Sequence, residues 1–163
     1  MDNFYRAKNK ENGEWVYGIY LPLLDGACMI PDDARICRKA ETVDGEEING
    51  HLIETVPIKR STLGMCIGIE DNAGMPVFSG DYIKVKTASV VKSICGLDAA
   101  VQDGILLAEE TDRGFLLFDG ETFSINALQF LHRLQESGGE FTVCGNIYDN
   151  PELTPEVRKN SIA

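Results

Sequence analysis

The sequence lacks any long apolar run, which argues against a membrane-spanning helix. Of its 163 residues, 44% are hydrophobic and 25% are charged, a balance typical of folded globular proteins. The longest apolar stretches, such as residues 104–108, have the length of a strand, whereas a membrane helix needs about 18 or more apolar residues. The N-terminus also lacks a basic segment followed by an apolar one, so we expect no secretory signal and a cytoplasmic location.

Histidine is scarce and cysteine is scattered, and both facts argue against a metal centre. The two histidines are His51 and His132, and no two of the five cysteines have C-x-x-C spacing. An odd number of scattered cysteines is typical of reduced thiols rather than of a disulfide framework. No Walker-type or dinucleotide-type glycine pattern is present. We therefore expect no metal and no cofactor.

Basic residues are too few to cover a broad phosphate-binding face. There are 15 of them against 26 acids, which gives a net charge of −11, and residues 101–163 alone hold 11 acids and 4 bases. Nucleic-acid affinity depends largely on basic contacts that release counterions. We therefore do not expect nucleic acid as a partner. Small basic concentrations remain at Arg35/Arg38/Lys39, Lys59/Arg60 and Lys84/Lys86/Lys92.

The dominant periodicity is two, which is typical of β-strands. We expect short strands over residues 4–8, 14–21, 27–30, 51–58, 65–69, 76–78, 81–87, 90–94, 105–109, 115–119, 122–125 and 141–148. Asn12-Gly13 predicts a hairpin between the first two strands, and Pro22 is expected to stop the second. Since parallel strands would need helices between them, this spacing favours a mainly β fold with a minor α+β character and antiparallel strands.

The chain is expected to form one domain over residues 1–163. Within it we expect an N-terminal β region (1–78), an SH3-like small barrel (79–149) and a C-terminal tail (150–163). Ser124 is the expected cap of a helix that Gly138-Gly139 ends, and Thr154-Pro155 indicates a second short helix. Residues 42–49 are expected to form an exposed acidic loop.

Three stretches form an ordered set of motifs. They are F-x-R followed by N-G-E-W-V-Y-G within residues 4–18, G-I-E-D-N-A-G-M-P-V-F-S-G-D-Y-I-K-V at 68–85, and V-C-G-N-I-Y-D-N-P-E-L at 143–153. Together they resemble the YopX family of small proteins, which phages and prophages commonly encode. The resemblance implies a mainly β fold and an origin in mobile genetic elements, and it implies no reaction. Residues 25–50 and 89–110 lie outside the matching stretches.

Many residues of these motifs are explained by the turns they can form, and they need no catalytic role. The side chains of Asp71 and Asn72 can bond the backbone that follows them, and Gly74 can turn the chain back. Gly80-Asp81 is expected to be a turn that leads into a strand. Gly145-Asn146 is expected to interrupt the final strand as a bulge or a close backbone contact.

Six motif residues are candidates for a binding surface. They are Trp15, Tyr17, Asp81, Lys84, Asn146 and Tyr148. Trp15 and Tyr17 could join Lys84 and Lys86 in an aromatic and basic face that stacks nucleic-acid bases. Their alternation is also what a packed core produces, and we expect Trp15 to be a core residue.

A nucleophilic enzyme is a further alternative. Cys66 or Cys144 could pair with His132 as thiol and base, but both cysteines lie in apolar stretches and are expected to be buried. Adjacent carboxylates such as Glu109-Glu110 point to opposite faces of a strand and cannot easily share a site.

We therefore expect no enzymatic activity. The leading hypothesis is a phage- or prophage-derived accessory protein of the bacterial cytoplasm that binds a host or phage protein, or assembles with itself as a homo-oligomer through strand edges. The alternatives are a nucleic-acid-associated regulator and a cysteine–histidine hydrolase.

Overall fold

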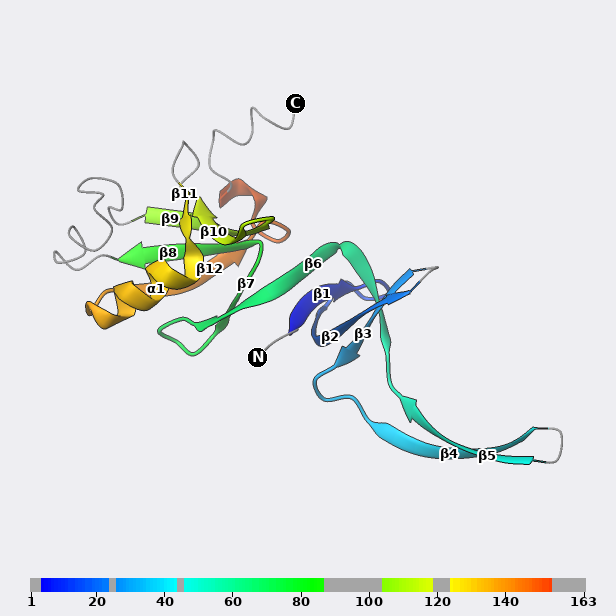
Figure 1. The fold of residues 1–163 in the computed structure, drawn as a ribbon. Helices are drawn as coiled ribbons and strands as arrows, with labels where there is room; N and C mark the ends of the chain where they lie inside the picture. The colour runs from blue at the N-terminus through cyan, green and yellow to red at the C-terminus, as the bar shows by residue number, and fades with distance from the viewer. Residues whose placement is uncertain (1–3, 24–25, 44–45, 87–103, 119–123, 154–163) are drawn as a thin grey trace. The chain divides into compact units, whose positions relative to one another are not determined.

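The computed structural model describes residues 4–23, 26–43, 46–86, 104–118 and 124–153 (Figure 1). The chain divides into two compact units, Asp2–Gly64 and Met65–Ala163. We call them the N-terminal unit and the C-terminal unit, and the expectation of a single domain stays a prediction. The strand expected at residues 90–94 and the helix expected from residue 154 lie outside the described residues.

Antiparallel strands dominate both units. The N-terminal unit contains β1 (Tyr5–Asn9), β2 (Trp15–Leu23), β3 (Gly26–Pro31), β4 (Ile36–Val43), β5 (Glu46–Ile53) and the first part of β6 (Val56–Glu70). The C-terminal unit contains the rest of β6, β7 (Pro76–Phe78), β8 (Asp81–Lys86), β9 (Gly104–Thr111), β10 (Gly114–Phe118), β11 (Ser124–Asn126), α1 (Ala127–Glu136), β12 (Glu140–Asn146) and a 3-10 helix (Pro151–Leu153). The predicted mainly β, antiparallel fold is therefore confirmed.

The N-terminal unit starts with the hairpin that Asn12-Gly13 predicts. β1 and β2 pair antiparallel, and Gly13 adopts a φ of 78° in the turn, a conformation that costs glycine little. β2 pairs with β3, β3 with β6, and β6 again with β1, so these four strands pair in a circuit. The core of this unit is made by Ala7, Ala27, Met29 and Ile58, with Tyr5, Val16, Tyr20 and Leu63 packed against them.

The prediction of an acidic loop at residues 42–49 is wrong. Most of these residues lie in a hairpin of β4 and β5, which pair from Ile36↔Ile53 to Val43↔Glu46. The sequence Asp44-Gly45 between the two strands is a hairpin signal. The acidic and polar residues around it led instead to the prediction of a loop. The strand expected at 51–58 is also wrong, because β5 ends at Ile53 and β6 begins at Val56.

Two prolines do not end strands as expected. β2 continues through Pro22 to Leu23, and Pro57 is the second residue of β6. Proline removes only one backbone donor, so strands accept it close to their ends. The strand expected at 65–69 is instead the second part of the 15-residue β6.

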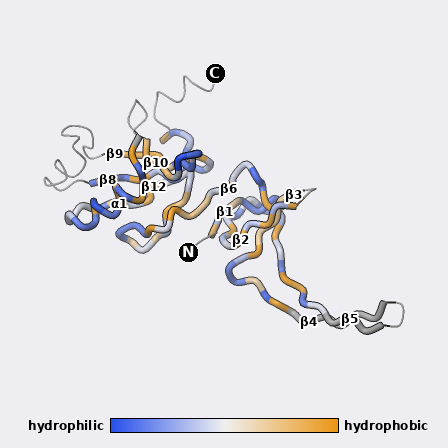
Figure 2. Tube along the Cα trace, in the orientation of Figure 1, coloured by the Kyte–Doolittle hydropathy of each residue, from blue (hydrophilic) through white to orange (hydrophobic). Residues whose placement is uncertain are grey.

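The C-terminal unit has a sheet with the strand order β11-β10-β9-β8-β12. Hydrophobic residues run along β9 and β10 (Figure 2). The helix α1 buries one side, contributed by Ala127, Phe130, Leu131 and Leu134. These residues share one core with Ile67, Ile69, Val77, Ile83, Val85, Leu106, Ala108, Leu117 and Phe141.

The predicted SH3-like barrel is not confirmed. Among the described strands of this unit, β11 and β12 lie at opposite ends of the sheet, and a closed barrel would need these ends to pair. The helix prediction also needs a correction at its start. Asn126 caps α1, since its side chain accepts a 2.9 Å hydrogen bond from the Gln129 amide, while Ser124 belongs to β11.

The turn Asp71–Gly74 is bonded to the outer edge of β12. The buried Asp71 carboxylate accepts the Ala73 and Met75 amides on Oδ1, at 2.8 and 2.9 Å. Its Oδ2 accepts the Val143 amide of β12 at 2.9 Å. One side chain therefore shapes its own turn and joins it to a strand 72 residues later in the chain.

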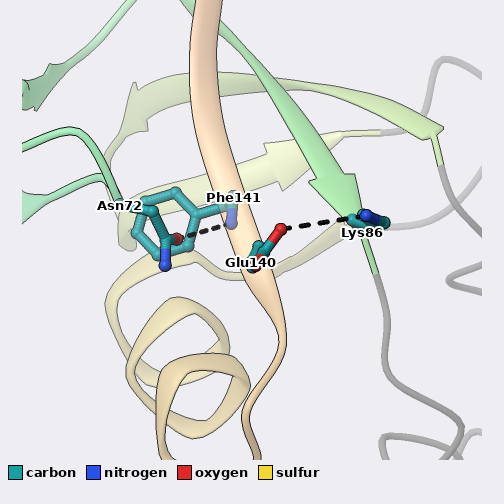
Figure 3. A network of polar contacts seen from close by, with 4 residues as sticks. All are labelled: Asn72, Lys86, Glu140 and Phe141. Carbon is teal, nitrogen blue, oxygen red and sulfur yellow. Dashed lines mark hydrogen bonds and ion pairs between the residues drawn. The ribbon is translucent and has the colours of Figure 1, made fainter.

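Asn72 continues this attachment along β12. Its side-chain Oδ1 accepts the Phe141 backbone amide at 2.8 Å (Figure 3). Its backbone amide donates to the Phe141 carbonyl at 3.1 Å. The opposite side of β12 pairs with β8. The two side chains thus take the place that a neighbouring strand would fill.

We predict that Asp71→Asn destabilises the C-terminal unit by about 2–3 kcal/mol, because an amide has a single acceptor oxygen and must leave a buried backbone donor unmet. Urea unfolding followed by circular dichroism measures the loss, and hydrogen exchange at the Val143 amide should accelerate. The exposed Asp112→Asn is the matched control and should leave both unchanged. Equal stability of the two variants contradicts the proposed role of Asp71.

We predict that Gly18→Ala destabilises the N-terminal unit by about 3 kcal/mol, as overpacking does. A Cβ at Gly18 would overlap the backbone carbonyl of Ile30 on β3, whereas a Cβ at Gly26 meets no heavy atom within 4 Å. Gly26→Ala is therefore the control. Trp15 is the single tryptophan of the chain, so its fluorescence during urea unfolding reports on this unit. Coincident unfolding curves for the two variants would contradict the prediction.

Candidate functional site

Asp81 is fully buried at the start of β8. Its Oδ2 accepts the Phe78 amide at 2.8 Å, which closes the turn between β7 and β8 as the sequence predicts. In the sheet it stands opposite Asn146 of β12. The structure therefore brings these two candidate residues together. The Asp81 carboxylate stabilises the turn before β8.

Asn146 holds the turn that follows β12. Its Oδ1 accepts the amides of Tyr148 and Asp149, each at 3.0 Å, and its Nδ2 donates to the Asp149 carboxylate at 3.1 Å. The predicted interruption at Gly145 is present as a shift of register between Val143 and Gly145. Tyr148 is half-buried. The polar side-chain atoms of Asn146 are thus hydrogen-bonded within the chain.

Trp15 is half-buried and lies outside the N-terminal core, so the expectation of a core residue is wrong. The register pairs Lys8 with Trp15 and Arg6 with Tyr17, which places all four on one face of the hairpin, opposite Ala7 and Val16. The Arg6 guanidinium lies 4.8 Å and the Lys8 ammonium 5.2 Å from the Trp15 ring centroid. A stacking base would therefore have to compete with two cations for this ring.

Lys84 and Lys86 are exposed on β8, in the C-terminal unit. Lys86 lies 4.0 Å from Glu140 (Figure 3), and both side chains are largely exposed, so this ion pair contributes little to stability. Trp15 and Tyr17 belong to the other unit. The basic and aromatic candidates of the predicted stacking face are therefore divided between the two units.

The cysteine–histidine pairs have no support from the described geometry. Cys66 is buried as predicted, but Cys144 is exposed, which corrects that expectation. His51 and His132 are exposed, and within the described ranges neither imidazole is recorded in a hydrogen bond with a thiol. The Cys144 Sγ instead donates to the Tyr82 carbonyl at 3.4 Å.

The electrostatic setting of Cys144 also differs from that of a nucleophile. Although the residue is exposed overall, partial desolvation of its sulfur raises the pKa of the Cys144 thiol above its usual value, and hydrogen bonds and the charge of Lys84 offset this only partly. Reactive cysteines have a lowered pKa, which makes the thiolate available at neutral pH. Cys144 is therefore a poor nucleophile in this setting.

The described residues form neither a metal-binding cluster nor a membrane-spanning helix. Within the described ranges, no group of three or more histidine, cysteine, aspartate or glutamate residues is arranged to hold a metal ion. Among the same residues, no helix has both the length and the apolar character to cross a membrane.

The N-terminal unit contains a groove that the sequence candidates did not include. Its volume is ≈ 710 Å³, within the usual range for ligand-binding clefts. The apolar part of its lining is contributed by Pro22, Leu23, Ala27, Cys28, Pro57 and Ile58. Lys10 and Arg60 complete the lining and are both exposed. The groove therefore combines an apolar wall with two cations.

These two cations are available to an external group. Among the described residues, no ion pair is recorded for either Lys10 or Arg60. Leu23 is 54% exposed at the same groove. Sequence reasoning noticed Lys59-Arg60 only as a basic patch, because the groove depends on how β2, β3 and β6 pair.

We predict that iodoacetamide alkylates Cys144 more slowly than it alkylates free cysteine near neutral pH, because the raised pKa leaves less thiolate. A pH series with mass spectrometry of the peptide that contains Cys144 should give a midpoint above the usual cysteine value. Lys84→Gln removes a charge that favours the thiolate, so it should slow the reaction further. A midpoint below the usual value would instead restore Cys144 as a candidate nucleophile.

Comparisons with known proteins bear on both the fold and the family of this chain. No curated protein matches the chain. The crystal structure of protein EF1440 from Enterococcus faecalis is similar, with a TM-score of 0.54 and 18% sequence identity over 92% of this chain and 96% of that one. The sequence profile of the YopX protein family matches residues 4–154, which include all three motifs. The chain belongs to the YopX family.

Proposed function

We propose that this protein acts without catalysis, by binding an extended protein segment that carries acidic and apolar side chains. The observation that carries the proposal is the groove lined by Leu23, Ile58, Lys10 and Arg60. The segment belongs to a host protein, a phage protein or another copy of this chain.

The lining of the groove determines what it can select. Apolar side chains of the segment would cover the exposed Pro22 and Leu23 and leave water, which supplies most of the favourable free energy. Carboxylates of the segment would meet Lys10 and Arg60, which raises the association rate and disfavours basic segments. Guanidinium and carboxylate groups also match in a bidentate geometry.

The C-terminal unit is less suited to this role. Its motif carboxylates and amides, those of Asp71, Asn72, Asp81 and Asn146, accept backbone hydrogen bonds. They shape turns and strand ends of their own unit. This supports a binding site in the N-terminal unit, and the hydrogen bonding of Cys144 supports a role other than nucleophilic catalysis.

A second candidate function is nucleic-acid association. It is favoured by the half-buried Lys8 and Trp15, which lie side by side on one face of the β1–β2 hairpin, whereas Arg6 on that face is buried. Binding of single-stranded DNA that weakens steeply with salt would support it, and no binding at low salt would remove it. This candidate needs no contribution from Lys84 and does not depend on a closed SH3-like barrel.

The cellular setting is part of the proposal. The YopX resemblance supports an origin in a phage or prophage. The described cysteines Cys28, Cys66 and Cys144 are free thiols, which supports a reducing compartment such as the bacterial cytoplasm.

We predict that a random-peptide display selection on the full chain enriches sequences that combine Asp or Glu with aliphatic residues. Affinity of the enriched peptides, measured by fluorescence anisotropy, should fall about tenfold or more in the double variant Lys10→Glu/Arg60→Glu, since both contacts become repulsive.

Lys84→Glu/Lys86→Glu is the control for this experiment, because it makes the same charge change on exposed lysines of the other unit. It should leave peptide affinity unchanged. No enrichment by a monomeric chain, enrichment of basic peptides, or equal losses in both double variants would refute the proposed function.

A further inference from the structure

The hairpin of β4 and β5 is the second unusual feature of the N-terminal unit. Each strand has eight residues, and the two pair with each other along their whole length. In the described part of the chain they form a sheet of their own, since neither pairs with any other strand (Figure 1). An isolated two-stranded hairpin is only marginally stable in water. We call this hairpin the arm.

The base of the arm is apolar and uncovered. Ile36 is 66% exposed, and its cross-strand partner Ile53 is 45% exposed. The adjacent Leu52 is 54% exposed. Ile36 and Ile53 share one face of the arm and Leu52 lies on the other, so both faces of the base present aliphatic side chains to solvent.

The outer half of the arm is acidic. The register pairs Glu41 of β4 with Ile48 and Glu46 of β5 with Val43, which places these four residues on one face of the arm, while Glu47, opposite Thr42, lies on the other face. The sequence from residue 40 to residue 50 contains no lysine or arginine. The arm thus combines the chemical features that the groove selects, carboxylates beside aliphatic residues in an extended backbone.

We propose that the occupant of the groove is the arm of a second copy of this chain. This inference rests on the proposed function and names the partner. It is carried by the charge complementarity between the outer half of the arm and Lys10 with Arg60, together with the lack of any other strand beside the arm. An eight-residue strand is about 26 Å long, enough to reach across to a neighbouring molecule.

Reciprocal exchange follows from the symmetry of such a pair. Each copy has one arm and one groove, so two copies related by a two-fold axis satisfy both arms and both grooves in a closed dimer. The strand edges of the arm and the apolar base become covered at the same time. The dimer is held in part by charge, so its dissociation constant rises with ionic strength.

The test is a charge swap measured by sedimentation equilibrium on the full chain. The arm variant is Glu41→Lys/Glu46→Lys, and the groove variant is Lys10→Glu/Arg60→Glu. On the face of the arm that carries residues 41 and 46, either variant alone gives arm and groove the same sign, so the dimer should weaken about tenfold or more. In an equimolar mixture, every arm meets a groove of opposite charge, and dimers of one arm variant with one groove variant should form at nearly wild-type affinity.

The control for the arm variant is Glu110→Lys/Glu136→Lys, which makes the same charge change at exposed positions of the C-terminal unit. It should dimerise like the wild type. A monomeric wild-type chain, a dimer indifferent to both charge-swap variants, or a mixture that stays monomeric would overturn the inference.

These results are distinguishable from failure of the proposed function. A monomeric chain whose groove still binds acidic and apolar peptides retains the proposed function and loses this inference. A dimer that the charge swap restores, in a chain that enriches no peptides, supports the inference and limits the groove to self-assembly.

Discussion

The carboxylate of Asp71 is the interaction on which the C-terminal unit depends most. It accepts three backbone amides, two from its own turn and one from β12. A buried charge is costly unless hydrogen bonds replace its lost water, and here backbone donors that would otherwise lack partners do so. The central and the C-terminal motifs of the YopX family therefore meet in one cluster, which gives a structural reason why both occur in this sequence.

Local chemistry predicted much of the fold. Asn12-Gly13 indicated the first hairpin, alternation indicated β8, and paired glycines indicated the end of α1. The errors arose where composition was used in place of turn chemistry, as at residues 42–49, where acidic residues were interpreted as a loop. The closed barrel was inferred from strand spacing alone, and spacing does not determine which strands pair.

The candidate site was less predictable than the fold. Asp81 and Asn146 stood out in the sequence because they are polar among apolar neighbours, but they accept hydrogen bonds from nearby amides. The groove involves Lys10 and Arg60, which are 50 residues apart and belong to no shared motif. Only the pairing of β6 with β3 and β1 explains why they line one surface, and such long-range pairing leaves no local pattern.

The attachment of Asn72 to β12 has a consequence for aggregation. An open strand edge can template the addition of further strands, which is how fibrils grow. In the C-terminal sheet, side chains occupy donors on the outer edge of β12, and the strand at the other end, β11, has only three residues. That sheet therefore offers a growing fibril little exposed strand edge to extend.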